Sequence, residues 1–202
     1  QWEGGVGSTN RYVYDNWNVL RVLDGANNVL ESYVHGPDLS GTIGGAGGIG
    51  GILSVAHAGG PWRFYHADGN GNIALITDAS EQETARIEYD PFGRVLINTA
   101  NQPVRYQFSS KEYDAAVGVN YYGYRFYSPG WGRWINPDRI GHRGGVNLYA
   151  FVRNRPSVSF DALGLSPCSD PDYSSRIPGD VANPGDCEIT DQWSELTSTE
   201  VS

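Results

Sequence analysis

The residues best placed to do chemistry are two aspartates, Asp138 and Asp161, near the ends of the aromatic-rich stretch 121–165. Two carboxylates that approach each other closely can share a proton, so that one serves as a base toward water and the other as an acid. The stretch is dense in Tyr, Trp and Phe and is interrupted by Gly and Pro. Such a stretch is expected to pack as an aromatic plug, and the two aspartates would offer an acid–base pair near its ends.

Motifs for other chemistry are missing from the sequence. His35, His57, His66 and His142 stand singly, without Cys or carboxylates at the spacing of metal ligands. Neither G-x-S-x-G nor H-E-x-x-H occurs. The Gly-rich segment 36–60 lacks the Gly-Lys-Ser/Thr of a phosphate-binding loop. The sequence therefore predicts no cofactor, no metal site and no independent hydrolase.

Composition favours strands over helices. The 202 residues include 27 Gly, 11 Pro, 13 Tyr and 6 Trp, and aromatic side chains suit a pleated surface. No Met occurs, so we expect the chain to be a portion of a longer protein. The net charge of −9 and the single Lys111 argue against a nucleic-acid partner, which requires clustered cations. No apolar run is long enough to span a membrane.

A repeated pattern precedes the aromatic stretch. An Asp with an apolar residue five positions later occurs at Asp15, Asp24, Asp68 and Asp90, and Asn or Gly stands third after each. Asp bonds its own backbone in turns, and Asn or Gly accepts the positive φ of tight hairpins. The runs between these turns are expected to be strands, at 19–23, 28–34, 73–77, 84–89 and 104–108. The segment 36–60 is expected to be a loop between strands.

Within the aromatic stretch, alternation over 121–127 places Tyr122, Tyr124 and Phe126 on one face of a predicted strand. Residues 147–153 are expected to form a strand or a short helix. After Leu165 the chain becomes polar, Pro-rich and acidic, with eight acidic residues against one Arg. Both cysteines lie there, and they predict either a Cys168–Cys187 disulfide or two free thiols.

Several ordered motifs resemble the RHS repeat-associated core domain over roughly residues 10–165. They are YDPFGR at 89–94, KEYD at 111–114, YYGYRFY at 121–127, GRW at 132–134, NLY at 147–149 and DALGL at 161–165. The resemblance implies an all-β fold, in which YD-repeat hairpins form part of a spiralling sheet or shell closed by a core plug. The expected domains are YD-type hairpins at 1–108 with the Gly-rich insertion 36–60, the core domain at 109–165, and an irregular acidic tail at 166–202.

The resemblance also implies a function. Such shells enclose or display a C-terminal region, often a toxin, and many cut the chain directly after the last Leu of the core domain. Asp138 and Asp161 are then the expected catalytic residues of an aspartyl autoprotease, with Leu165–Ser166 as the scissile bond and Arg153 as an orienting cation. In this chain Arg139 and Ala162 replace the Pro that usually follows each Asp in the family.

A second hypothesis is a cell-surface or fibre-type adhesion module without catalysis. Exposed aromatic patches would favour adhesion, whereas buried aromatics would favour encapsulation. The expected partners are the remainder of the same polypeptide, another copy joined through an open β-edge, or a cell-surface molecule. The expected location is extracellular or on the surface of a bacterial cell.

Overall fold

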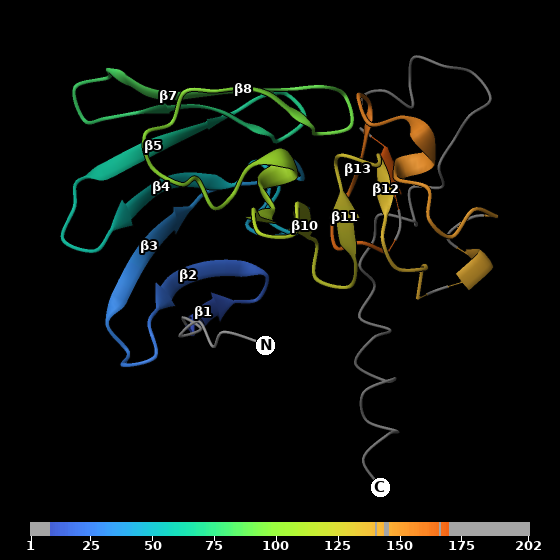
Figure 1. The fold of residues 1–202 in the computed structure, drawn as a ribbon, viewed down its shortest axis with the longest axis horizontal. Helices are drawn as coiled ribbons and strands as arrows, with labels where there is room; N and C mark the ends of the chain where they lie inside the picture. The colour runs from blue at the N-terminus through green and yellow to red at the C-terminus, as the bar shows by residue number, and fades with distance from the viewer. Residues whose placement is uncertain (1–8, 140, 144–145, 166, 170–202) are drawn as a thin grey trace, which may run out of the picture. The chain divides into compact units, whose positions relative to one another are not determined.

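The computed structural model describes residues 9–139, 141–143, 146–165 and 167–169, and the chain divides into the compact units Gln1–Tyr113 and Asp114–Ser202. The first unit is an antiparallel sheet of eight strands, each hydrogen-bonded to its neighbours in the sequence (Figure 1). The strands are β1 (Arg11–Asp15), β2 (Asn18–Leu23), β3 (Val29–His35), β4 (Ile52–His57), β5 (Trp62–Ala67), β6 (Ile73–Thr77), β7 (Glu83–Tyr89) and β8 (Val95–Asn98). The all-β prediction is confirmed.

Four hairpin turns of this sheet share one geometry. In each, an Asp Oδ1 accepts the backbone N–H groups two and four residues later, and the third residue after the Asp has a positive φ. The anchoring residues are Asp24, Asp68, Asp78 and Asp90, and the positive-φ residues are Asn27 (68°), Gly71 (78°), Glu81 (61°) and Gly93 (86°). Each turn is a type I turn followed by a bulge, which shifts the strand register by one residue.

The sequence pattern predicted the turns at Asp24, Asp68 and Asp90. It also predicted a turn of this kind at Asp15, which the structure does not have. At Asp15 the chain uses a shorter connection, in which Asp15 pairs with Asn18 and Asn16 has the positive φ of 52°. Asn18 is therefore a strand residue, contrary to the prediction. The Asp78 turn was missed because Glu81 replaces the Gly or Asn that marks the other turns.

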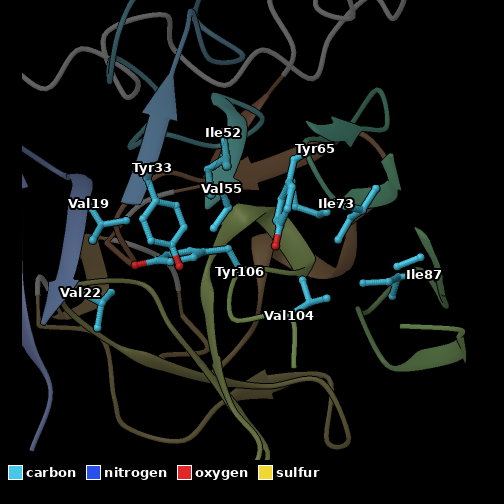
Figure 2. Packing of buried hydrophobic residues seen from close by; sticks show 12 residues of the cluster. Val19, Val22, Tyr33, Ile52, Val55, Tyr65, Ile73, Ile87, Val104 and Tyr106 are labelled. Carbon is cyan, nitrogen blue, oxygen red and sulfur yellow. The ribbon is translucent and has the colours of Figure 1, made fainter. Parts of the chain in front are cut away.

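The core lies on the inner face of the sheet, against the segment that follows β8. Figure 2 shows Val104 and Tyr106 of that segment among side chains from the strands, with the Tyr106 ring centroid 5.2 Å from that of Tyr33. The predicted strand 104–108 is wrong. Only Tyr106 makes a β-bridge, to Glu112, and Phe108–Ser110 forms the 3₁₀ helix η1.

A polar network ties the same segment to distant strands. Arg105 donates from Nε to Glu31 of β3 at 2.7 Å, and from Nη1 to Glu112 at 2.9 Å and to the Tyr12 hydroxyl of β1 at 3.2 Å. Glu31 and Tyr12 are 74 and 93 residues away from Arg105 in the sequence. The segment is thus held by charge-assisted hydrogen bonds as well as by apolar packing.

The Gly-rich segment is only partly a loop. β4 lies inside the range predicted to be a loop, because Ile52–His57 pairs on one edge with β3 and on the other with β5. The remaining loop is ordered around the buried Asp38, whose Oδ2 accepts the N–H groups of Ala46 and Gly48. Lys111 Nζ donates to the Gly47 carbonyl at 2.8 Å.

The second unit contains short strands and 3₁₀ turns. β10 (Val119–Tyr121), β11 (Phe126–Ser128) and β12 (Arg133–Trp134) pair in that order, and β13 (Ser159–Asp161) pairs with β14 (Pro167–Ser169). The remaining elements of this unit are η2 (Gly141–Arg143) and η3 (Val152–Asn154), and β9 (Glu112–Asp114) spans the boundary between the two units. Residues 147–153 form neither the predicted strand nor a regular helix, because 147–151 are turns and a bridge and η3 has positive φ at Val152, Arg153 and Asn154. Among the described residues, no helix is long and apolar enough to cross a bilayer.

The predicted continuous strand at 121–127 is wrong. Gly123 has a φ of 105°, and the Tyr122 N–H bonds to the Arg125 carbonyl, so the chain turns between β10 and β11. This turn places Tyr122 with Tyr127, Trp134 and Phe151 in one buried cluster, with ring centroids 4.1–6.0 Å apart. The aromatic stretch is packed, as a plug requires.

Candidate functional site: an arginine between two aspartates

Arg125, in the turn between β10 and β11, contacts both predicted aspartates. Its Nη1 lies 2.8 Å from Asp138 Oδ2, and its Nη2 lies 3.1 Å from Asp161 Oδ2. The side chains of Arg125, Asp138 and Asp161 are only 3%, 6% and 2% exposed. Two carboxylates 23 residues apart in the sequence thus meet at the two ends of one guanidinium, away from bulk water.

The Arg125 side chain is fixed from several directions. Its Nε donates to the Gly164 carbonyl at 2.6 Å, and its guanidinium lies 4.1 Å from the centroid of the Trp134 ring. This arrangement joins a cation–π contact to a planar set of hydrogen bonds, which only arginine can provide. Burial lowers the pKa of Arg125, and the two carboxylates oppose that shift.

Asp161 ends β13 and closes the turn that follows it. Its Oδ1 accepts the N–H groups of Leu163, Gly164 and Leu165 at 3.3, 2.7 and 3.0 Å. Burial raises the pKa of Asp161, while Arg125 and the three N–H donors act in the opposite direction. The carboxylate therefore positions the backbone up to the residue before the predicted scissile bond.

Glycine is required at position 164 of this turn. Gly164 has a φ of 79°, and a Cβ there would lie 3.2 Å from both the Arg125 amide nitrogen and the Tyr122 Cβ. The Tyr124 N–H also donates to the Leu163 carbonyl at 3.0 Å. The DALGL motif at 161–165 thus wraps closely around the turn that carries Arg125.

Asp138 is positioned by backbone hydrogen bonds. Its N–H donates to the Leu148 carbonyl, and its carbonyl accepts the Gly141 N–H, both at 3.1 Å. The Arg139 side chain, which follows where the family has Pro, lies 5.8 Å from the centroid of the Tyr124 ring. Arg125, and not the neighbouring Arg139, is therefore the cation that the structure pairs with Asp138.

The predicted orienting cation, Arg153, lies elsewhere. It is exposed, has a φ of 54° in η3, and forms no hydrogen bond or ion pair with any described residue. Arg125 occupies the orienting position instead. The sequence carried a signal for it, because Arg125 is the only charged residue in the aromatic run 121–127. A cation in such a run must be buried with a partner or turned to solvent.

The remaining predicted site residues fall partly outside the described residues. Ser166, on the far side of the scissile bond, and Cys187 lie outside them. The backbone of Cys168 is described and pairs with Phe160, but its side chain is not. The disulfide therefore stays a prediction. Within the described ranges, no group of three or more His, Cys, Asp or Glu side chains is arranged to hold a metal ion.

The chain is similar to bacterial toxin subunits and to a solved toxin structure. No family model matches the sequence. Toxin subunit YenC2 of Yersinia entomophaga is 45% identical over 87 residues, which are 40% of this chain and 9% of that protein. Toxin subunit YenC1 of the same organism is 38% identical over 110 residues, 52% of this chain and 11% of that protein. The crystal structure of TcdB2-TccC3 matches with a TM-score of 0.60 and 25% identity, over 81% of this chain and 8% of that one.

The chain belongs to the RHS-associated proteins. The resemblance drawn from its motifs is confirmed, and its fold is that of an RHS shell. This RHS-associated chain spans about a tenth of the length of the relatives named above. The activities of those whole proteins therefore bear on it only as proposals.

Proposed function

We propose that this chain is part of a shell that encloses or displays a C-terminal region of its own polypeptide, and that it cuts its backbone after Leu165. The likeness to toxin subunits of much greater length supports the first part. The second part rests on one observation. The carboxylate of Asp161, paired with Arg125, accepts the N–H of Leu165, whose carbonyl would be attacked.

Asp161 lies directly against the residue whose carbonyl would be attacked. Asp161 Oδ1 lies 3.0 Å from the Leu165 nitrogen, and that nitrogen is about 2.5 Å from its own carbonyl carbon by standard backbone geometry. The carboxylate oxygen is therefore within about 5.5 Å of the scissile carbon. Asp161 is thus near enough to hold the scissile peptide directly, which leaves activation of the water to the second aspartate.

We assign the two aspartates different roles. Both oxygens of Asp161 face donors, since Oδ1 accepts three N–H groups and Oδ2 faces Arg125, so Asp161 holds the segment in place. Asp138 is the remaining carboxylate, so we assign it the role of base; its side chain is 6% exposed, and the attacking water must enter beside it. Asp138 takes a proton from water as the water oxygen attacks the Leu165 carbonyl carbon. The bond to the Ser166 nitrogen then breaks, and that nitrogen receives the proton.

Intact-mass analysis of the chain tests this proposal. We expect a break after Leu165 that yields peptide 166–202, and cleavage in ¹⁸O-water should place one ¹⁸O in the new Leu165 carboxylate. Asp138→Asn and Asp161→Asn should both leave the chain whole. Asp114→Asn is the matched control, because Asp114 is an exposed Asp of the same unit. Equal cleavage in the Asp161→Asn variant and the unaltered chain would rule out the assignment.

Enclosure has its own test. If the shell retains what it cuts, peptide 166–202 should elute with the rest of the protein in native size-exclusion chromatography and separate in denaturant. Elution of the peptide alone under native conditions would contradict retention.

Adhesion stays as a second candidate because some aromatics are exposed. Trp131 is 74% exposed, and Trp62 and Phe64 are both 41% exposed. The buried cluster around Trp134 favours the enclosing role for the aromatic stretch itself. Binding of a glycan array by the protein, and its loss in Trp131→Ala, would support adhesion over enclosure.

A further inference from the structure

A cavity of about 500 Å³ opens on the inner face of the eight-stranded sheet. Its walls come from β4 to β7 and from the segment 100–104, all within the first unit. This volume is in the range of sites that bind small molecules or single side chains. It is separate from the aspartate site, which belongs to the second unit.

The floor of the cavity is apolar. Tyr65, Ile76, Ala85 and Val104 line it, and each is less than a tenth exposed. Figure 2 shows Tyr65 and Val104 close together in the core. The Tyr65 hydroxyl has no hydrogen-bond partner in the part of the chain that the structure describes. The floor thus offers an apolar surface with one polar group for a ligand.

The charges around the cavity leave one cation uncompensated. Glu83 is held by Arg86, at 2.5 and 3.2 Å, and His57 Nδ1 lies 3.6 Å from Glu31. Arg63, by contrast, forms no hydrogen bond or ion pair with any described residue, although it lines the cavity and is half-buried. A partly desolvated guanidinium without a partner is unfavourable, and an anion would relieve that cost.

The sheet itself sets this arrangement. Arg63 is opposite Val55 in the β4–β5 pair, and it shares a face with Tyr65 two residues along β5. Val55 is a core residue, so this face is the inner one. Arg63 therefore lines the cavity from the inner face, where a long cationic side chain can lay its apolar stem on apolar surface and keep its charged head free.

We propose that this cavity binds a carboxylate carried on an apolar ring or branched chain. The planar fork of Arg63 would pair with the carboxylate, and the floor around Tyr65 would receive the apolar body. A free organic acid and the C-terminal residue of a peptide share this chemistry. The site is independent of self-cleavage and of enclosure.

Ligand-observed ¹⁹F NMR with the whole chain tests the proposal, using 4-fluorophenylacetate and its neutral amide as probes. We expect the acid to bind about tenfold tighter than the amide, as a charge-assisted pair requires. Arg63→Met keeps the apolar stem and should abolish this preference, whereas Arg94→Gln, at an exposed Arg outside the cavity, should keep it. Ala100→Phe, which fills the cavity from its rim, should weaken both probes.

Two of the possible outcomes would overturn the proposal. No binding of the acid, or an acid preference that survives in Arg63→Met, overturns the proposal. A tripeptide ending in phenylalanine, used as a competitor, identifies the source of the ligand. Displacement of the acid assigns peptide ends as ligands, and no displacement restricts the site to free acids. Unchanged melting temperatures of the variants exclude loss of folding as the cause of lost binding.

Discussion

Replacing Arg125 by Met should destabilise the second unit strongly. The change keeps an unbranched side chain that can still lie against Trp134, but it removes the cation shared by Asp138 and Asp161. Both carboxylates would then be buried without their partner. Asp161 would keep its three backbone donors, and so the loss falls on the ion pairs and on the Gly164 carbonyl.

The size of the effect follows from the burial. Removing one partner of a buried ion pair typically costs about 3–5 kcal/mol, because a charge is left uncompensated. Arg125 serves two such pairs, but their energies share one cation and do not add. We expect a loss of about 4–6 kcal/mol, which is comparable to the whole stability of many domains.

Urea unfolding followed by tryptophan fluorescence measures this loss, since Trp134 is fully buried in the same unit. The decisive comparison is the triple variant Arg125→Met, Asp138→Asn, Asp161→Asn. Its amides can still accept the backbone N–H groups, but no charge remains buried at this site. We expect the triple variant to recover about 2–3 kcal/mol relative to Arg125→Met alone. A triple variant no more stable than the single one would refute the account of a charge-compensated site.

Three further predictions concern the first unit. Glu81→Gly should raise its stability by about 0.5–1 kcal/mol in thermal unfolding, because the relieved positive-φ strain exceeds the added chain entropy. Gly93→Ala should lower it by about 2–3 kcal/mol, since the new Cβ would lie 2.5 Å from the Phe108 ring; equal effects at the two positions would contradict this reasoning. His35 has its pKa lowered by burial, so the unfolded state binds more protons and stability should fall as pH drops below about 6.5. His35→Gln should flatten that pH dependence, and an unchanged slope would show that another group causes it.

The hairpin turns at Asp24, Asp68 and Asp90 were predictable because everything that specifies them is local. The Asp acceptor and the positive-φ residue stand within five positions of each other, as at Asp68 and Gly71. β4 was missed because its strand character comes from pairing on both edges, which no local pattern in the Gly-rich segment signals. The segment 104–108 was mistaken for a strand because its apolar residues fill the inner face instead of pairing along an edge.

The candidate site was predictable in part. Asp138 and Asp161 were named from the family resemblance, and the structure joins them through one guanidinium. Strand alternation over 121–127 concealed that cation, because the alternation assumed that the chain runs straight through Gly123. Once the chain turns there, Arg125 points toward DALGL and no longer lies on a strand face.

The Arg105 network has a consequence for the order of folding. The eight strands pair only with sequence neighbours, so the sheet can form from local contacts and we expect it to form quickly. Arg105 reaches Glu31 and Tyr12 across 74 and 93 residues, and it is synthesised after all eight strands. During synthesis the inner face of the sheet must therefore wait, apolar and uncovered, until residues 100–112 emerge. We therefore expect docking of residues 100–112 to reduce recognition of the nascent chain by chaperones and proteases.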